Sequence, residues 1–301
     1  MNAQALPSTI PEYLEQLRAA LKGADPALVQ DALYDAEEYL RAELAEQRGR
    51  SEAEVIASVA GSYGAPEEVA EIYRDTEVKV SRALRTPKPP QRTTWYGKFF
   101  GVAADPHTYG ALFYMLLALA TGTFYFSWVV TGASLATGML ILIVGVPLLV
   151  LFLMSVRLLS LVEGRIVETL LGERMPRRPL YTQRDKRWLQ RLKELFTDAR
   201  TWTTMGYFLL MLPLGTAYFS VVVFLLSLAL GFIASPLSLL ISGWEVVSLG
   251  SWSMTRDAPW LLPLVSVLGL LLLFCTLHLA RQVGRFHAWL AKHLLVRDPV
   301  I

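Results

Sequence analysis

Residues 109–156 read YGALFYMLLALATGTFYFSWVVTGASLATGMLILIVGVPLLVLFLMSV, forty-eight residues without one Asp, Glu, Lys, Arg or His. At ~1.5 Å per residue a single helix of this length would be roughly 70 Å long, more than twice the ~30 Å hydrocarbon core of a bilayer. The stretch therefore predicts two membrane crossings. Small and polar residues between Thr131 and Gly138 divide it, which predicts helices over 109–131 and 139–156 joined by a tight turn.

Two further crossings are expected closer to the C-terminus. A charge-free run from Thr201 to Trp244 predicts a helix over 205–233, and residues 258–280 form another apolar run that only His278 interrupts. Between them lies an outer segment, 234–257, whose apolar part Ser235–Trp244 is short and is more typical of an interfacial segment than of a fifth crossing. The sequence thus predicts an all-α protein whose membrane domain, 109–280, has four transmembrane helices.

The charges are segregated along the chain. Residues 1–79 hold sixteen acidic and seven basic residues, whereas the remainder holds ten and twenty-one. Eleven Lys or Arg lie within 157–200, five within 82–98 and four within 281–297, and the first hairpin turn has none. By the positive-inside rule, the N-terminus, the loop 157–203 and the amphipathic tail 281–301 are expected on the cytoplasmic side of the membrane. The start of the sequence has no cleavable signal pattern.

Residues 1–79 are expected to form a small acidic domain of three or four helices. Asp25-Pro26 is a helix N-cap followed by proline, and Ser51 with Glu54 forms a capping box. The second helix is expected to expose five acidic residues: Asp31, Asp35, Glu38, Glu43 and Glu46. A solvated helix face is the simpler interpretation, because charge on a helix exterior needs no further cause. The alternative is a docking surface for a basic partner.

Several motifs in this region resemble the HAAS domain, a helical signalling module. They are Tyr13-Leu14-x-x-Leu17-x-x-Ala20-Leu21, the acidic helix ending at Gly49, Ser51-Glu52-Ala53-Glu54, and Tyr63-Gly64-Ala65-Pro66-Glu67-Glu68-Val69-Ala70-Glu71-Ile72-Tyr73. The resemblance covers roughly residues 10–76. It implies a module placed ahead of membrane segments, and it implies that a PadR-like transcriptional regulator binds residues 1–79.

A basic connector, 80–108, joins this domain to the membrane segments. Pro87, Pro89 and Pro90 favour a stiff, extended chain, and they are candidate coupling residues. The aromatic residues that follow, interleaved with Lys98, predict a helix at the membrane surface: Trp95, Tyr96, Phe99 and Phe100. Because this stretch adjoins the bilayer, direct binding of nucleic acid is not expected.

The membrane domain contains an internal duplication. Shifting Asp105–Gly138 by ninety-three positions onto Asp198–Gly231 gives seventeen identities in thirty-four pairs, among them Tyr114/Tyr207, Gly122/Gly215 and Tyr125/Tyr218. If both copies begin in the cytoplasm, they are parallel repeated hairpins related by a pseudo-two-fold axis along the membrane normal. Gly164-Arg165 matches Gly284-Arg285 at an offset of 120, which implies an insertion of 120 − 93 = 27 residues in the outer segment.

The duplicated hairpins also resemble the sensor domain that precedes the catalytic parts of actinobacterial-type histidine kinases. The resemblance covers about 105–296 and rests on motifs such as Gly122-Thr123-Phe124-Tyr125-Phe126, Val144-Gly145-Val146-Pro147, Glu163-Gly164-Arg165 and Leu212-Pro213-Leu214-Gly215. It implies a signal-detecting membrane domain. No phosphoacceptor helix or ATP-binding glycine motif follows it, so the output is expected to pass through the N-terminal domain.

Two groups of residues are candidates for detecting and transmitting a signal. The outer segment supplies a candidate sensing patch, for which a tryptophan-anchored interfacial segment is the alternative interpretation: Trp244, Glu245, Trp252, Arg256 and Asp257. Glu163, Arg165 and Arg285 are candidate coupling residues. The simpler interpretation is that Glu163 and Arg165 snorkel at the membrane edge or form a structural ion pair, either with each other or with Arg281 and Arg285. No catalytic, cofactor or metal-binding pattern is recognisable, and Cys275 is the single cysteine.

The sequence therefore favours a non-enzymatic membrane sensor that couples an envelope or lipid signal to a cytoplasmic partner. A small transporter or channel component is the alternative, because parallel repeats with kinked helices also build pores. A homo-oligomer is compatible with the sequence. Whether the acidic domain rests on the basic 157–200 loop of its own chain is left open, since attraction between exposed charges is screened over ~8 Å at physiological salt.

Overall fold

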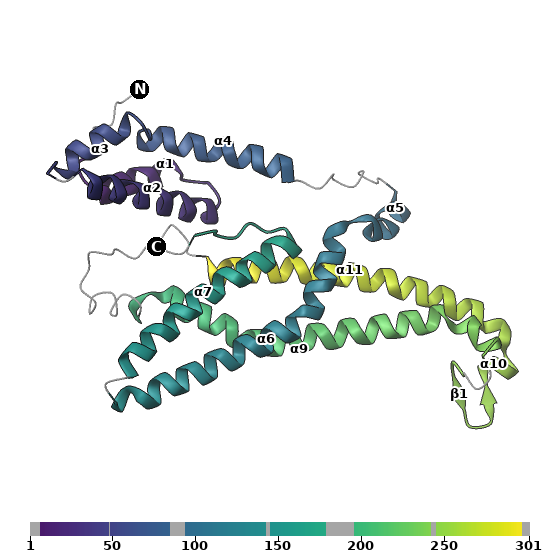
Figure 1. Ribbon diagram of the computed structural model, residues 1–301. Helices are drawn as coiled ribbons and strands as arrows, with labels where there is room; N and C mark the ends of the chain where they lie inside the picture. The colour runs from purple at the N-terminus through teal and green to yellow at the C-terminus, as the bar shows by residue number, and fades with distance from the viewer. Residues whose placement is uncertain are drawn as a thin grey trace.

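The protein was analysed as a computed structural model that describes residues 7–47, 49–84, 94–142, 145–178, 196–241 and 245–296, without the side chains of 79–84. Its described part is mostly helical, with one two-stranded hairpin and short irregular segments, and a small N-terminal unit lies against a bundle of long helices (Figure 1). The candidate residues Pro87, Pro89, Pro90 and Trp244 lie outside the described residues.

The N-terminal unit has four helices: α1 (Ile10–Ala20), α2 (Pro26–Glu46), α3 (Glu52–Ala60) and α4 (Pro66–Leu84). The predicted helix starts are confirmed. The Asp25 side chain accepts from the backbone N–H of Ala27 at 2.9 Å, and Ser51 and Glu54 form both bonds of the capping box. Tyr13 is fully buried in the core and donates from its hydroxyl to the Gly64 carbonyl at 2.8 Å.

The capping box gives a testable contribution to the stability of this unit. Replacing Ser51 with alanine leaves the Glu54 N–H without its side-chain acceptor, so α3 should lose about 1 kcal/mol of stability. Amide hydrogen exchange across α3 measures this loss. Ser58→Ala, at an exposed position inside the same helix, is the control and should leave exchange unchanged or slower. Equal exchange in both variants would contradict the role of the box.

The bundle consists of four long helices and several short connecting elements. The long helices are α6 (Pro106–Gly138), α7 (Gly145–Leu171), α9 (Ala199–Ile233) and α11 (Leu262–Leu295). The connecting elements are α5 (Trp95–Phe100), η1 (Gly101–Ala104), η2 (Met139–Ile141), η3 (Ser235–Leu239), β1 (Ser248–Leu249), β2 (Trp252–Ser253), α10 (Met254–Asp257) and η4 (Pro259–Leu261). All four long helices, extended where short helices adjoin them, are long and apolar enough to cross a membrane, which confirms the predicted number of spans.

Two predicted helix ends are wrong. The turn expected within Thr131–Gly138 is helical, because α6 continues to Gly138 and the chain turns only after it. Small residues such as glycine, alanine and threonine are common inside membrane helices, so they do not mark a turn there. Likewise α11 extends without a break to Leu295, so residues 281–295 of the segment expected as a separate tail form its last ~4 turns.

The two hairpins meet where α6 crosses α9. A Cβ atom on Gly122 would collide with the Met211 carbonyl, and one on Gly215 would collide with the Ala118 carbonyl. The internal repeat relates these two contacts to each other, since 211 − 118 and 215 − 122 both equal ninety-three. The glycines therefore let the two backbones touch, as in close helix pairs within membranes.

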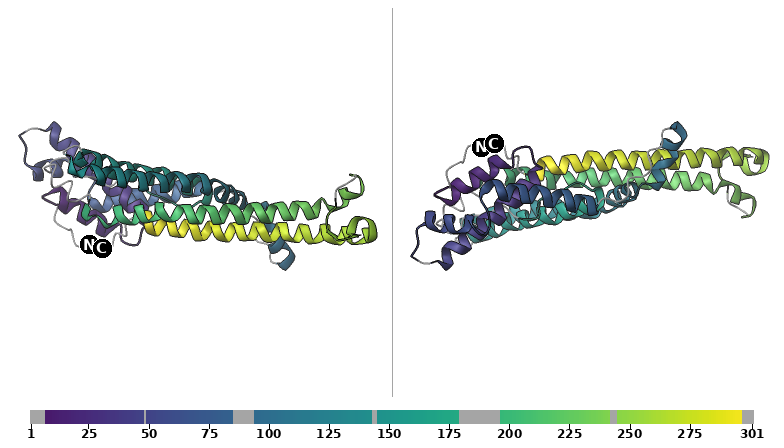
Figure 2. Two further views of the ribbon diagram at one scale, coloured as in Figure 1. Left: turned by 90° about the horizontal axis from the view of Figure 1, so that it is seen from below. Right: turned by 90° about the horizontal axis from the view of Figure 1, so that it is seen from above.

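The direction of the crossing differs from the parallel arrangement expected from the sequence. Tyr125 of α6 stacks on Phe208 of α9 at 4.5 Å between ring centroids, and the closed ends of the two hairpins lie at opposite ends of the bundle (Figure 1). The pseudo-two-fold axis thus passes across the helices at the crossing. The expectation rested on loop charges, which predict the side of the membrane on which each hairpin begins, and the packing of α6 against α9 departs from it. Figure 2 shows the resulting elongated bundle with the N-terminal helices along one half of it.

The structure also corrects the offset of the second half of the repeat. Asp105, the N-cap of α6, pairs with Arg281 at 2.7 Å, and Asp198, the N-cap of α9, pairs with Arg157 at 2.7 Å. Arg157 and Arg281 are therefore equivalent at 281 − 157 = 124 positions, and the insertion is 124 − 93 = 31 residues. The match of Gly164-Arg165 to Gly284-Arg285 at 120 was a coincidence of two residues.

Candidate functional site

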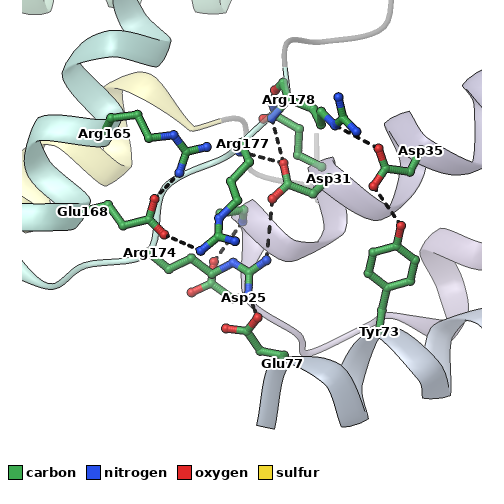
Figure 3. Close-up of polar contacts among 12 residues, drawn as sticks. Asp25, Asp31, Asp35, Tyr73, Glu77, Arg165, Glu168, Arg174, Arg177 and Arg178 are labelled. Carbon is green, nitrogen blue, oxygen red and sulfur yellow. Dashed lines mark hydrogen bonds and ion pairs between the residues drawn. The ribbon is translucent and has the colours of Figure 1, made fainter. Parts of the chain in front are cut away.

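The segment that follows α7 crosses the acidic helix α2 of the N-terminal unit (Figure 3). Oδ1 of Asp31 accepts hydrogen bonds from the backbone N–H groups of Arg177 at 2.7 Å and Arg178 at 3.0 Å. Asp31 is 6% exposed, so this carboxylate is enclosed by the contact rather than facing solvent. We call the contact of Asp31 and Asp35 with Arg174, Arg177 and Arg178 the clasp.

Ion pairs reinforce the clasp on both sides of Asp31. Arg174 lies 3.6 Å from Oδ2 of Asp31 and also pairs with Glu77 of α4. Arg178 pairs with Asp35 at 3.1 Å, and Asp35 accepts from the Tyr73 hydroxyl at 2.9 Å. Burial raises the pKa of Asp31, while the two backbone hydrogen bonds and the charge of Arg174 oppose that shift. Burial lowers the pKa of Arg174, opposed mainly by Asp31.

The ends of two other long helices reach the same helix α2. Gln30 donates to the Arg178 carbonyl at 2.9 Å and accepts from the guanidinium of Arg200, at the start of α9, at 2.9 Å. Lys292, near the end of α11, pairs with Asp25 at 2.8 Å and also with Glu173. The end of α7, the start of α9 and the end of α11 are therefore all bound to α2. A relative movement of these three ends would act directly on the N-terminal unit.

A second polar cluster is buried inside the bundle and takes residues from all four long helices. Glu163 of α7 accepts at Oε1 from the hydroxyls of Tyr114 at 2.7 Å and Tyr207 at 2.9 Å, and at Oε2 from Tyr125 at 3.0 Å. Nε2 of His287 lies 2.5 Å from the Tyr114 hydroxyl and 2.8 Å from that of Tyr207. Neither Glu163 nor His287 is exposed.

This buried cluster follows the symmetry of the repeat. Tyr114 and Tyr207 are equivalent at an offset of ninety-three, and Glu163 and His287 at 287 − 163 = 124, the offset that also relates Arg157 to Arg281. One half of the site thus has a carboxylate where the other has an imidazole. The expected pairs of Glu163 with arginine are wrong, because Arg165 pairs with Glu168, Arg281 with Asp105, and Arg285 is exposed.

Comparison with known families agrees with both parts of this architecture. A family model described as "Putative sensor" matches residues 114–295, which is more than half of the chain. The chain belongs to this sensor family. A second family model, HAAS, matches residues 12–72, so the order of a HAAS domain followed by a sensor domain is as predicted. No curated protein and no solved structure matches the chain. The helices and both families together identify a membrane protein with a sensor and signalling role.

The acidic residues predicted as one docking face occupy different environments on the HAAS domain. Asp31 and Asp35 belong to the clasp. Glu38 and Glu46 are exposed on α2, and Glu43 accepts from the side chain of Gln47 at 3.0 Å. The helical pattern placed all five on the outside, but it could not show that residues 172–178 cover one end of that face.

The segment 245–257 of the sensor domain is folded by short-range contacts. Arg256 pairs with Glu245 at 3.3 Å, and both are exposed. Asp257 accepts from the backbone N–H of Ser253 at 2.7 Å, and Trp252 lies in strand β2. Gly250 forms the tight turn between β1 and β2 with a φ of 63°. The structure brings four of the five candidate sensing residues into one small hairpin and its following turn.

An apolar groove also opens between α6 and α7 of the sensor domain. Its volume is about 410 Å³, and its lining includes Phe124, Trp128, Leu148, Leu151 and Phe152. Trp128 donates from its indole N–H to the Ser155 hydroxyl at 2.9 Å across the two helices. Among the described residues, no three His, Cys, Asp or Glu side chains gather where they could hold a metal ion.

Proposed function

We propose that this protein is a sensor of the bacterial inner membrane in which the transmembrane helices control access to the HAAS domain. Both termini and the segment 172–178 are cytoplasmic in this proposal. When the clasp opens, Asp31 and Asp35 join Glu38 and Glu46 as a docking surface for a cytoplasmic partner, a PadR-like transcriptional regulator. The protein performs this role without catalysis.

One observation carries the proposal: helix α7 leads directly into the segment that covers Asp31. Contacts with the start of α9 and the end of α11 bind the same helix α2. A rearrangement of the bundle therefore changes the clasp without any additional relay. An envelope or lipid signal would act by favouring one of two packings of the hairpins. The shift between the packings cannot exceed the difference in the signal's binding free energy for them.

The proposal predicts that a weakened clasp binds the regulator more tightly. Arg174→Ala combined with Arg178→Ala removes the ion pairs from the membrane side and leaves the HAAS residues intact. Binding of a purified PadR-like regulator to the full chain in lipid nanodiscs should tighten about tenfold or more, since each tenfold change corresponds to ~1.4 kcal/mol.

Two further chains make this binding experiment decisive. Arg285→Ala removes an exposed arginine of α11 and should bind like the unaltered chain. Deletion of residues 1–79 should abolish binding. Binding that survives this deletion, or an arginine double variant that binds no better than Arg285→Ala, would contradict the proposed output.

A transporter or channel component is the second candidate, and the buried cluster favours it. Glu163 and His287 are ionisable groups enclosed by four membrane helices, and such groups often mark ion or proton pathways. Measurement of proton flux into liposomes that contain the purified protein separates the two candidates. A sustained flux that Glu163→Gln abolishes would support transport.

A further inference from the structure

The buried cluster has five hydrogen-bonding contacts, but its three tyrosine hydroxyls supply only three protons for them. Each tyrosine hydroxyl carries one proton, and an ionised carboxylate only accepts. If Tyr114, Tyr125 and Tyr207 donate to Glu163, the short contacts from Nε2 of His287 to Tyr114 and Tyr207 require a proton on Nε2. Nδ1 of His287 is buried and has no partner in the described part of the chain.

The proton on Nδ1 therefore decides the net charge of the cluster. With it, the imidazolium of His287 balances the carboxylate of Glu163 and the cluster is neutral. Tyr114 can redistribute this charge by receiving the Nε2 proton while its own proton passes to Glu163, which leaves both groups neutral. Tyr207 offers a second, symmetry-related bridge of the same kind. Loss of one proton in either arrangement leaves a net negative charge.

A net charge in this position is costly because water does not reach it. Glu163 and His287 have no exposed surface and lie among α6, α7, α9 and α11. Three hydroxyl groups solvate the carboxylate, but no described cation contacts it once His287 is neutral. An unpaired buried charge strongly destabilises the packing around it. Loss of the proton should therefore loosen the four helices around the cluster.

The helices that carry Glu163 and His287 also reach α2 at or beside the clasp. Arg174 follows Glu163 by eleven residues, and Lys292 follows His287 by five. Lys292 pairs with both Glu173 and Asp25, so it joins the ends of α7 and α11 to α2. Arg174 and Lys292 lie within a few helical turns of the cluster. A shift of α7 against α11 there would therefore change the contacts of Arg174 with Asp31 and of Lys292 with Asp25.

We propose that the cluster of Glu163, Tyr114, Tyr207 and His287 is a proton-binding site, and that release of its proton opens the clasp. This inference rests on the proposed function, for which it supplies the ligand and the direction of the response. The titratable groups that face the site are Tyr114 and Tyr125 from α6, Tyr207 and Tyr218 from α9, Glu163 from α7 and His287 from α11.

The test uses the full chain in lipid nanodiscs, with solvent protons as the only ligand. Hydrogen exchange of the Arg177 and Arg178 amides reports the clasp, because both amides donate to Asp31. After correction with an unstructured peptide, their protection should fall at least tenfold between mildly acidic and mildly alkaline pH. Potentiometric titration over the same range should show one proton more released by the unaltered chain than by Glu163→Gln.

Glu163→Gln should keep the hydrogen bonds and lose the response. Its side-chain oxygen still accepts from Tyr114 and Tyr207, and its amide N–H donates to the Tyr125 hydroxyl, which then accepts instead of donating. Glutamine cannot carry the charge, so the clasp should stay protected at both pH values. Tyr218→Phe is the matched control. Its buried hydroxyl has no partner among the described residues, although its ring lies 5.7 Å from that of His287, and this variant should respond like the unaltered chain.

Three outcomes overturn the proposal: equal protection of the unaltered chain at both pH values, an unaltered response in Glu163→Gln, or a lost response in Tyr218→Phe. If Glu163→Gln does not fold, the double variant Tyr114→Phe with Tyr207→Phe removes both bridges and should also lose the response. Failure of the proposed function is seen separately. In that case the Arg174→Ala and Arg178→Ala chain opens its clasp but binds no regulator, while the proton response of the unaltered chain persists.

Discussion

Replacing Gly122 with leucine is expected to cost the bundle at least ~3 kcal/mol of unfolding free energy, at the upper end of overpacking effects. The reason is that the α6 backbone touches the carbonyl of Met211, so a side chain at Gly122 has no room unless α9 moves. Gly215→Leu should cost a similar amount, because its contact with the Ala118 carbonyl is the symmetry equivalent. The loss should appear in denaturant titration of the reconstituted chain.

Gly206 provides the control for these two substitutions. It lies within α9, and an added Cβ would meet nothing within 4 Å. Gly206→Ala should therefore raise stability slightly, by up to ~1 kcal/mol, through helix propensity alone. If Gly122→Leu were as stable as the unaltered chain, the crossing of α6 and α9 could not be the contact that holds the hairpins together.

The sequence predicted well the features that depend on residues within one helix, and those that the internal repeat reveals. Four apolar runs identified four long helices, and the capping residues Asp25 and Ser51 marked helix starts that the structure confirms. The internal repeat identified Gly122 and Gly215 as equivalent before their contact was visible. Helix length, capping and repeat identity depend on neighbouring residues or on sequence alone.

The features that sequence missed depend on contacts between distant segments. Asp31 pairs with residues about 146 positions away, and Tyr114 meets His287 across 173 positions. Helical periodicity shows which face a residue occupies, but not which segment covers that face. The tyrosines that the repeat pairs, Tyr114 with Tyr207 and Tyr125 with Tyr218, were one sequence signal of the buried cluster. Glu163 could be picked out as an acidic residue near a span, but its partners could not.

The clasp gives the second large effect. Asp31→Ala removes the acceptor of two backbone N–H groups and one partner of Arg174. Because hydrogen bonds to a charged group contribute ~1.5–3 kcal/mol each, the closed clasp should lose about 3 kcal/mol. At ~1.4 kcal/mol per tenfold change, protection of the Arg177 and Arg178 amides should fall roughly 100-fold. Hydrogen exchange of the full chain in nanodiscs measures both amides directly.

The order of effects along α2 tests whether burial or overall charge holds the clasp. Asp35→Ala breaks a partly exposed pair with Arg178, so its effect should be smaller than that of Asp31→Ala, at ~1 kcal/mol or less, and should decrease further as salt is added. Glu38→Ala, at an exposed position with the same charge, should change nothing. Equal effects of all three substitutions would show that α2 is held by general attraction to the basic segment. In that case Asp31 would have no special place in the contact, and a signal could release the HAAS domain without disturbing its hydrogen bonds.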